Sequence, residues 1–125
     1  MPEAGLAPAA AHDVVETEWG RLVWMVSGAL GNSETLTVGR CHIHPGRENP
    51  RHLHPDCDEV IHVLEGSIEH SCGDERVALE AGDAISIPAG LLHNARNVGD
   101  SEAVLLVAFS SATRRTIAEE DAAPA

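Results

Sequence analysis

The sequence contains no lysine and no tyrosine, and its aromatic residues are limited to two Trp and one Phe. Without lysine the chain cannot form a Schiff base, attach pyridoxal phosphate or use the lysine of a Walker phosphate-binding loop. So few rings also argue against a cavity that stacks large flat substrates. The longest apolar run, Ala103 to Phe109, has the length of a strand and falls well short of the roughly 18 residues of a membrane span. We therefore expect no membrane partner.

Positive charge is scarce as well, because 8 basic residues, all of them arginine, stand against 20 acidic ones. The formal net charge of −12 would repel nucleic acid, which is therefore not an expected partner. The N-terminal segment MPEAGLAPAAAH has neither a basic start nor a continuous apolar stretch, so we expect a cytoplasmic location without a secretory signal. Three cysteines without a C-x-x-C pair do not indicate a disulfide framework.

A chain of 125 residues has room for one domain. Residues 1–12 and 114–125 are rich in alanine and lack periodicity, which predicts two flexible tails, the second with a short helix as an option. Between them, over residues 13–113, short apolar or alternating runs are separated by turns rich in Gly, Pro, Asn and Asp. No convincing amphipathic helix interrupts this pattern. The pattern therefore predicts an all-β sandwich or barrel.

Histidine is the residue that the chain has in excess, with eight in all and five of them between Cys41 and His62. His52 and His54 form an H-x-H pair, whose two rings project from the same face of an extended chain. Such a pair can provide two ligands to one metal ion. The sequence therefore predicts that the functional site lies in the region from Cys41 to His62.

Two further ligands can join this pair. Glu59 follows Pro55 and Asp56, which can supply the turn that brings its carboxylate back, and His93 comes shortly after the turn at Pro88–Gly90. Three neutral imidazoles and one carboxylate suit a divalent transition metal and leave coordination positions open for water or substrate. The sequence thus predicts one metal ion, Fe(II), Mn(II), Ni(II), Co(II) or Zn(II), without choosing among them.

The spacing of these residues resembles the two sequence motifs of the cupin family. The first motif combines two Gly, an H-x-H pair and a Glu, and is matched here by Gly46, His52, His54, Glu59 and Gly66. The second combines Gly, P-x-G, His and Asn, and is matched by Gly82, Pro88, Gly90, His93 and Asn97. The resemblance implies a single-domain double-stranded β-helix, a jelly-roll barrel, in which His52, His54, Glu59 and His93 bind one metal ion.

The strand before the first motif carries two candidate catalytic residues, Arg40 and His42, which share one face by alternation. In decarboxylating and oxygenase cupins, the residue three positions before the Pro that opens the first motif often points at the metal. That position is His42 here, with Pro45 as the Pro. We predict that Arg40 binds a carboxylate or enolate while His42 moves a proton. An outward-facing position is an equal alternative for His42.

The remaining polar residues near the motifs receive plainer interpretations. His44 is expected on an exposed strand face or in a hydrogen bond to a ligand. His62 has the opposite strand parity to Glu59 and should face away from the metal. His70 is predicted at the surface or at a subunit interface, and Cys57 as an inert loop residue.

A metal with open coordination positions allows three kinds of function. We favour a metal-dependent dioxygenase that acts on a small oxygenated organic substrate. The alternatives are a non-redox lyase, isomerase or cyclase, and a barrel that binds a small molecule without turnover. We also expect a homodimer, because the edge strands of a small barrel need cover, and we expect Trp19–Ser27 to pair with or pack on the partner subunit.

Overall fold

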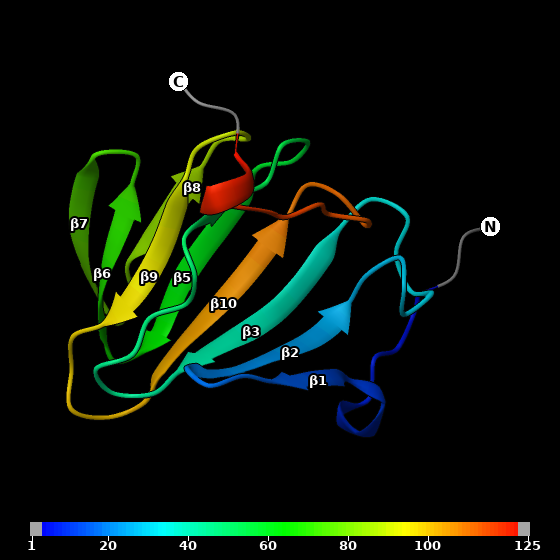
Figure 1. Ribbon diagram of the computed structural model, residues 1–125. Helices are drawn as coiled ribbons and strands as arrows, with labels where there is room; N and C mark the ends of the chain where they lie inside the picture. The colour runs from blue at the N-terminus through cyan, green and yellow to red at the C-terminus, as the bar shows by residue number, and fades with distance from the viewer. Residues whose placement is uncertain (1–3, 123–125) are drawn as a thin grey trace.

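The computed structural model describes residues 4–122, which fold into two antiparallel sheets that face each other (Figure 1). The first sheet has the order β1 (Asp13–Glu16), β2 (Gly20–Val26), β3 (Thr37–Ile43), β10 (Ala103–Phe109), β5 (Glu59–Glu65) and β8 (Ala84–Ile87). The second has the order β11 (Ile117–Ala118), β4 (His52–Leu53), β9 (His93–Asn97), β6 (Ser67–Cys72) and β7 (Glu75–Glu80). Two short 3-10 helices, η1 (Ala9–Ala11) and η2 (Glu119–Asp121), complete the described elements. The predicted all-β jelly-roll architecture is confirmed.

The core lies between the two sheets, because each central strand turns alternate side chains inward. Leu105, Val107 and Phe109 on β10, together with Ile61 and Val63 on β5, are each at most 4% exposed. Full burial of such a side chain contributes about 1.5–3 kcal/mol. This core fixes the faces of β5 and β10 and therefore the direction in which the first residue of β5 points.

Asn97, the last residue of β9, holds one loop and one strand end together. Its side chain is 1% exposed, and its Nδ2 donates hydrogen bonds of 2.8 Å to the carbonyl oxygens of Ile43 and Ser101. Its Oδ1 accepts a hydrogen bond of 2.9 Å from the backbone N–H of Gly99. One amide side chain therefore joins the end of β3 to the connection between β9 and β10.

The segment Trp19–Ser27 does not have the role predicted for it at a strand edge. β2 pairs with β1 on one side and with β3 on the other, so it offers no free edge to a partner subunit. Leu22 and Trp24 point into the barrel, where they line a cavity. Edge pairing with a partner is therefore excluded for this segment, because Asp13–Glu16, too short to recognise in the sequence, already covers β2. Packing of the segment on a partner subunit stays a prediction.

The C-terminal segment is also more ordered than a tail. Within the described residues it crosses one end of the barrel and forms β11, which pairs with β4 (Figure 1). The flexible tail predicted over residues 114–125 is therefore corrected at residues 117–121, where β11 and η2 form, and η2 matches the short helix that the sequence left as an option. Residues 1–3 and 123–125 of the two predicted tails lie outside the described residues. No helix of the described chain is long and apolar enough to cross a membrane.

Candidate metal centre

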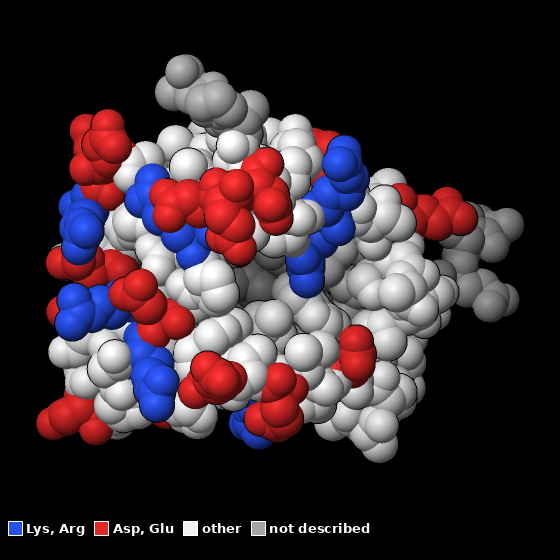
Figure 2. Space-filling view, viewed as in Figure 1, with Lys and Arg blue, Asp and Glu red and all other residues white. Residues whose placement is uncertain are grey.

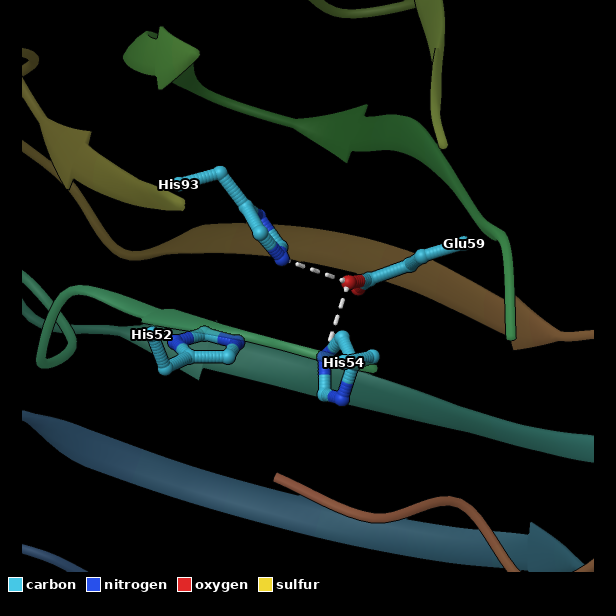
Figure 3. Close-up of side chains that lie close together, drawn as sticks. All are labelled: His52, His54, Glu59 and His93. Carbon is cyan, nitrogen blue, oxygen red and sulfur yellow. Dashed lines mark ion pairs between the residues drawn. The ribbon is translucent and has the colours of Figure 1, made fainter. Parts of the chain in front are cut away.

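The structure brings the four predicted ligands together between the sheets (Figure 3). β4 carries His52 and is followed directly by His54, while Glu59 begins β5 and His93 begins β9. One ligand atom from each residue lies within 4.8 Å of the other three. The two motifs, distant in sequence, therefore meet because β4 pairs with β9, with His52 directly opposite His93.

The Glu59 carboxylate is the centre of this cluster. Its Oε1 lies 3.3 Å from His54 Nε2 and 3.2 Å from His93 Nε2. These three atoms are buried and have no hydrogen-bond partner. A buried polar atom without a partner costs about 1–3 kcal/mol, so a cation that accepts their lone pairs explains the arrangement. The donor set, three imidazoles and one carboxylate, fits a divalent transition metal.

The other ring nitrogens hold two of these imidazoles in the orientation that a metal needs. His52 Nδ1 donates to the carbonyl oxygen of Pro50 at 2.7 Å, and His54 Nδ1 donates to that of Arg115 at 2.8 Å. A carbonyl can only accept, so the proton is on Nδ1 in both rings and the Nε2 lone pair is free to bind the ion.

His93 is oriented by a fourth histidine, His70. His93 Nδ1 lies 3.4 Å from His70 Nε2, and His70 Nδ1 lies 3.2 Å from Cys72 Sγ. The consistent arrangement has His93 donating to His70 and His70 donating to Cys72, which leaves His93 Nε2 for the metal. His70 is completely buried, so its predicted surface position is wrong. It shares the inward face of β6 with Ile68, a signal that the alternation already contained.

Burial keeps three of these imidazoles in the neutral form. It lowers the pKa of His93 to about 2 and that of His70 to about 4, and it also lowers the pKa of His52. Only a neutral imidazole can donate a lone pair to a metal. At pH 7 the site therefore binds an ion without first releasing protons from these rings.

We expect the His70→Phe variant to bind the metal about 10–100-fold more weakly, because it keeps the ring but loses the acceptor for His93. Competition against a chelator measures this affinity. His70→Gln supplies an amide oxygen as acceptor and should recover most of the loss. His62→Phe, on the outer face of β5, is the control. Unchanged metal affinity in a folded His70→Phe protein would contradict the positioning role.

A cavity of about 390 Å³ lies between the sheets, with the four ligands in its wall. Much of the wall is apolar and includes Trp19, Leu22, Trp24, Ile61, Leu105 and Phe109. Figure 2 shows a hollow near the middle of the face of the molecule that it draws, with basic side chains on two sides of the hollow. A cavity of this size and character suits a small organic molecule and strengthens electrostatic contacts inside it.

Arg40 and His42 do not face this cavity. Cys41, between them on β3, lines it, so alternation turns Arg40 and His42 to the outer face of the sheet. There His42 Nδ1 pairs with Glu102 Oε1 at 2.9 Å. The prediction that these two residues face the metal is wrong, because alternation tells which side chains share a face and not which face lies inside.

The other polar residues considered from the sequence lie away from the ligand atoms. His44 is exposed, and His62 is half-buried on the outer face of β5. Cys57 is buried, and burial raises the pKa of its thiol. No sequence motif or alternation marks two further cavity residues, Asn49 before β4 and Arg114 in the C-terminal segment.

Residues 39–109, more than half of the chain, match the family model described as "Cupin domain". The chain belongs to the cupin family. The matched range contains both motifs and all four ligands of the candidate metal centre. The family predicted from the motif spacing is thereby confirmed for this cupin.

Known proteins similar to this cupin include germin-like proteins and an oxalate oxidase. A germin-like protein of Morus alba is 36% identical over 85 residues, which cover 64% of this chain and 41% of the relative. Oxalate oxidase 1 of Hordeum vulgare is 31% identical over 103 residues, which cover 76% and 49%. The chain therefore spans less than half the length of these curated relatives.

Solved structures agree with this assignment of the fold. A structure of oxalate decarboxylase from Bacillus subtilis, a protein with Mn(II) centres, superposes with a TM-score of 0.81 at 21% identity. The superposition covers 89% of this chain and 31% of that chain. This likeness shows that the two proteins share the cupin fold.

Proposed function

We propose that this cupin is a mononuclear metal enzyme of the dioxygenase type, acting on a small oxygenated organic substrate. The carrying observation is the buried cluster of His54 Nε2, His93 Nε2 and Glu59 Oε1, which have no hydrogen-bond partner and belong to residues that line a cavity. A metal bound there would lower the pKa of an enol or acid and hold the substrate for reaction with O2. We propose Mn(II) as the first candidate, since one protein with a similar structure, oxalate decarboxylase from Bacillus subtilis, has Mn(II) centres.

The protein's own part in such a reaction is to orient the ligands and to exclude water. Hydrogen bonds to Pro50, Arg115 and His70 fix the imidazoles, so their lone pairs need no reorganisation when an ion binds. Apolar side chains around the cavity reduce the water around the substrate and strengthen its contact with charge.

A specific observation favours the oxygen-dependent reaction over a non-redox isomerase or cyclase. Those reactions need a side chain that accepts a proton from the substrate. Among the described cavity residues outside the ligand set, His70 has hydrogen-bond partners at both ring nitrogens, burial raises the pKa of the Cys41 thiol to about 12, and the Asp121 carboxylate is exposed to solvent. None of the buried groups is therefore suited to accept that proton.

Metal analysis and oxygen consumption test this proposal. Protein purified without added metal is analysed for its ions, loaded with Mn(II) or Fe(II), and screened on an oxygen electrode with small diketones, enols, catechols and organic acids. We expect O2 uptake that needs both metal and substrate. Substrate consumption without O2 uptake would establish the lyase or isomerase class instead, and binding without turnover would establish a binding protein.

We retain the homodimer as a proposal and place its interface on the outer face of the six-stranded sheet. Val14, Val60 and Leu64 on this face are 50%, 45% and 42% exposed. We expect a dimer mass in light scattering at tens of micromolar and a monomer for Leu64→Glu. Val98→Glu, at an equally exposed loop position, should stay dimeric. A monomeric wild-type protein would end this proposal.

A further inference from the structure

Arg114 places a positive charge in the wall of the metal cavity. Its guanidinium carbon lies 4.2 Å from the centre of the Trp24 ring and 5.1 Å from that of Phe109. Phe109 in turn packs edge-on against the ligand His54, with 4.9 Å between ring centres. A single aromatic ring therefore connects Arg114 to the proposed metal site.

The surface on which Arg114 rests is rigid. Gly39 on β3 lies beneath Trp24, and a Cβ added to it would come within 2.6 Å of Trp24 Cε3. The Trp24 ring also packs at 6.0 Å from Phe109. The rings under the guanidinium are fixed by β-strands, so Arg114 is held in place before any ligand binds.

Within residues 4–122, no ion pair joins Arg114 to a carboxylate. Its hydrogen bond in this region runs from Nη1 to Thr116 Oγ1 at 2.9 Å, which leaves most of the five guanidinium N–H donors for a ligand. This is notable in a chain with 20 acidic residues and 8 basic ones, where carboxylates are abundant. The half-buried guanidinium is available to a carboxylate from outside the protein.

The electrostatic surroundings also favour an added anion. Burial lowers the pKa of the Arg114 guanidinium, and the Glu59 carboxylate counteracts that shift. A divalent ion bound to Glu59 would offset the negative charge of that carboxylate, which would then stabilise the charged guanidinium less. A substrate carboxylate paired with Arg114 would supply a negative charge in its place, and such charge-assisted bonds gain strength where water is excluded.

We propose that Arg114 binds the carboxylate of the substrate, and that this cupin acts on a small organic acid whose other end carries an oxygen ligand for the metal. This inference rests on the proposed function and adds the class of substrate. Leu22, Ile61 and Leu105 line the same cavity and would contact the carbon chain between the two ends. The cavity of about 390 Å³ is larger than a two-carbon acid requires, so the favoured substrate has a carbon chain.

Binding to protein loaded with redox-inactive Zn(II) tests the inference without catalysis. Straight-chain dicarboxylates from succinate to pimelate are compared by calorimetry with monocarboxylates of the same length. In the wild type, we expect at least one dicarboxylate to bind ten or more times more tightly than its monocarboxylate. Arg114→Gln should abolish this advantage, and Arg114→Lys, which keeps the charge without the planar fork, should retain part of it.

Arg115→Gln is the matched control, since it removes the same charge from the next residue, whose side chain is exposed. Zinc content is measured in each variant first. A wild-type protein that does not retain zinc would contradict the proposed function. If zinc-loaded Arg114→Gln still binds a dicarboxylate more tightly than the matching monocarboxylate, the inference alone is overturned.

A metal-free titration separates the two ideas further. Hexanoate, but not hexanamide, should change the tryptophan fluorescence of metal-free wild-type protein, because Arg114 lies against Trp24. Arg114→Gln should lose this response and Arg115→Gln should keep it. Equal responses to hexanoate in wild type and Arg114→Gln would overturn the role of Arg114 whether or not the protein holds a metal.

Discussion

Replacement of Glu59 by glutamine, or of His93 by alanine, is expected to weaken metal binding by more than about 100-fold, since loss of a mere hydrogen-bond partner of a ligand already costs about 10–100-fold. Glu59 provides the negative charge of the cluster, and its Oε1 lies within 3.3 Å of both His54 Nε2 and His93 Nε2. Elemental analysis after gel filtration measures the ions bound per chain. The same variants should also lose the rise in melting temperature that added metal gives the wild type.

The exposed His44 offers the control for this experiment, because His44→Ala removes an imidazole outside the cluster. This variant should keep the full metal content of the wild type. One ion per chain in purified His93→Ala would remove His93 from the ligand set. Equal losses in His44→Ala and His93→Ala would indicate that the measured metal is bound at the surface.

Replacement of Asn97 by alanine is expected to lower the free energy of unfolding by about 2–4 kcal/mol, a large share of the stability of a small domain. The change leaves the buried carbonyl oxygen of Ile43 without its donor and also removes the contacts with Ser101 and Gly99. Urea unfolding followed by tryptophan fluorescence gives the free energy.

Val98→Ala is the matched control, because Val98 is the next residue in the chain and is 53% exposed. A surface truncation of this kind should change the stability by about 0.5 kcal/mol or less. If Asn97→Ala were as mild as Val98→Ala, the Asn97 hydrogen bonds would not be what holds the β9–β10 loop to the end of β3.

The ligand set could be predicted because it depends on local spacing. His52 and His54 lie two residues apart on extended chain, and nearby Pro and Gly residues indicate the turns before Glu59 and His93. The family motifs supply the one long-range fact, that these two places meet. The structure adds the reason, which is the pairing of β4 with β9.

Face selection was harder to predict than alternation. On the strand Thr37–Ile43, Cys41 shares a face with the core residue Ile43, which favoured an inward Cys41, but the polar face with Arg40 and His42 also suited a polar site. For β6 the decision was available, since Ile68 and His70 share a face and Ile68 is an obvious core residue.

Pairing of the C-terminal segment could not be predicted, because β11 contains two residues and its partner lies more than sixty residues earlier. Such a short strand carries no alternation. Its position depends on the cavity end that it covers, and that end exists only once both sheets have formed.

The support that the C-terminal segment gives to His54 comes from the backbone carbonyl of Arg115 and not from a side chain. Substitution at position 115 therefore leaves that hydrogen bond in place, whereas an insertion or deletion between Phe109 and β11 would displace the carbonyl and Arg114 together. Length should consequently be held constant here, while residue identity drifts at positions other than Arg114. Attempts to graft a new specificity onto this barrel are better made by exchanging side chains in the segment than by altering its length.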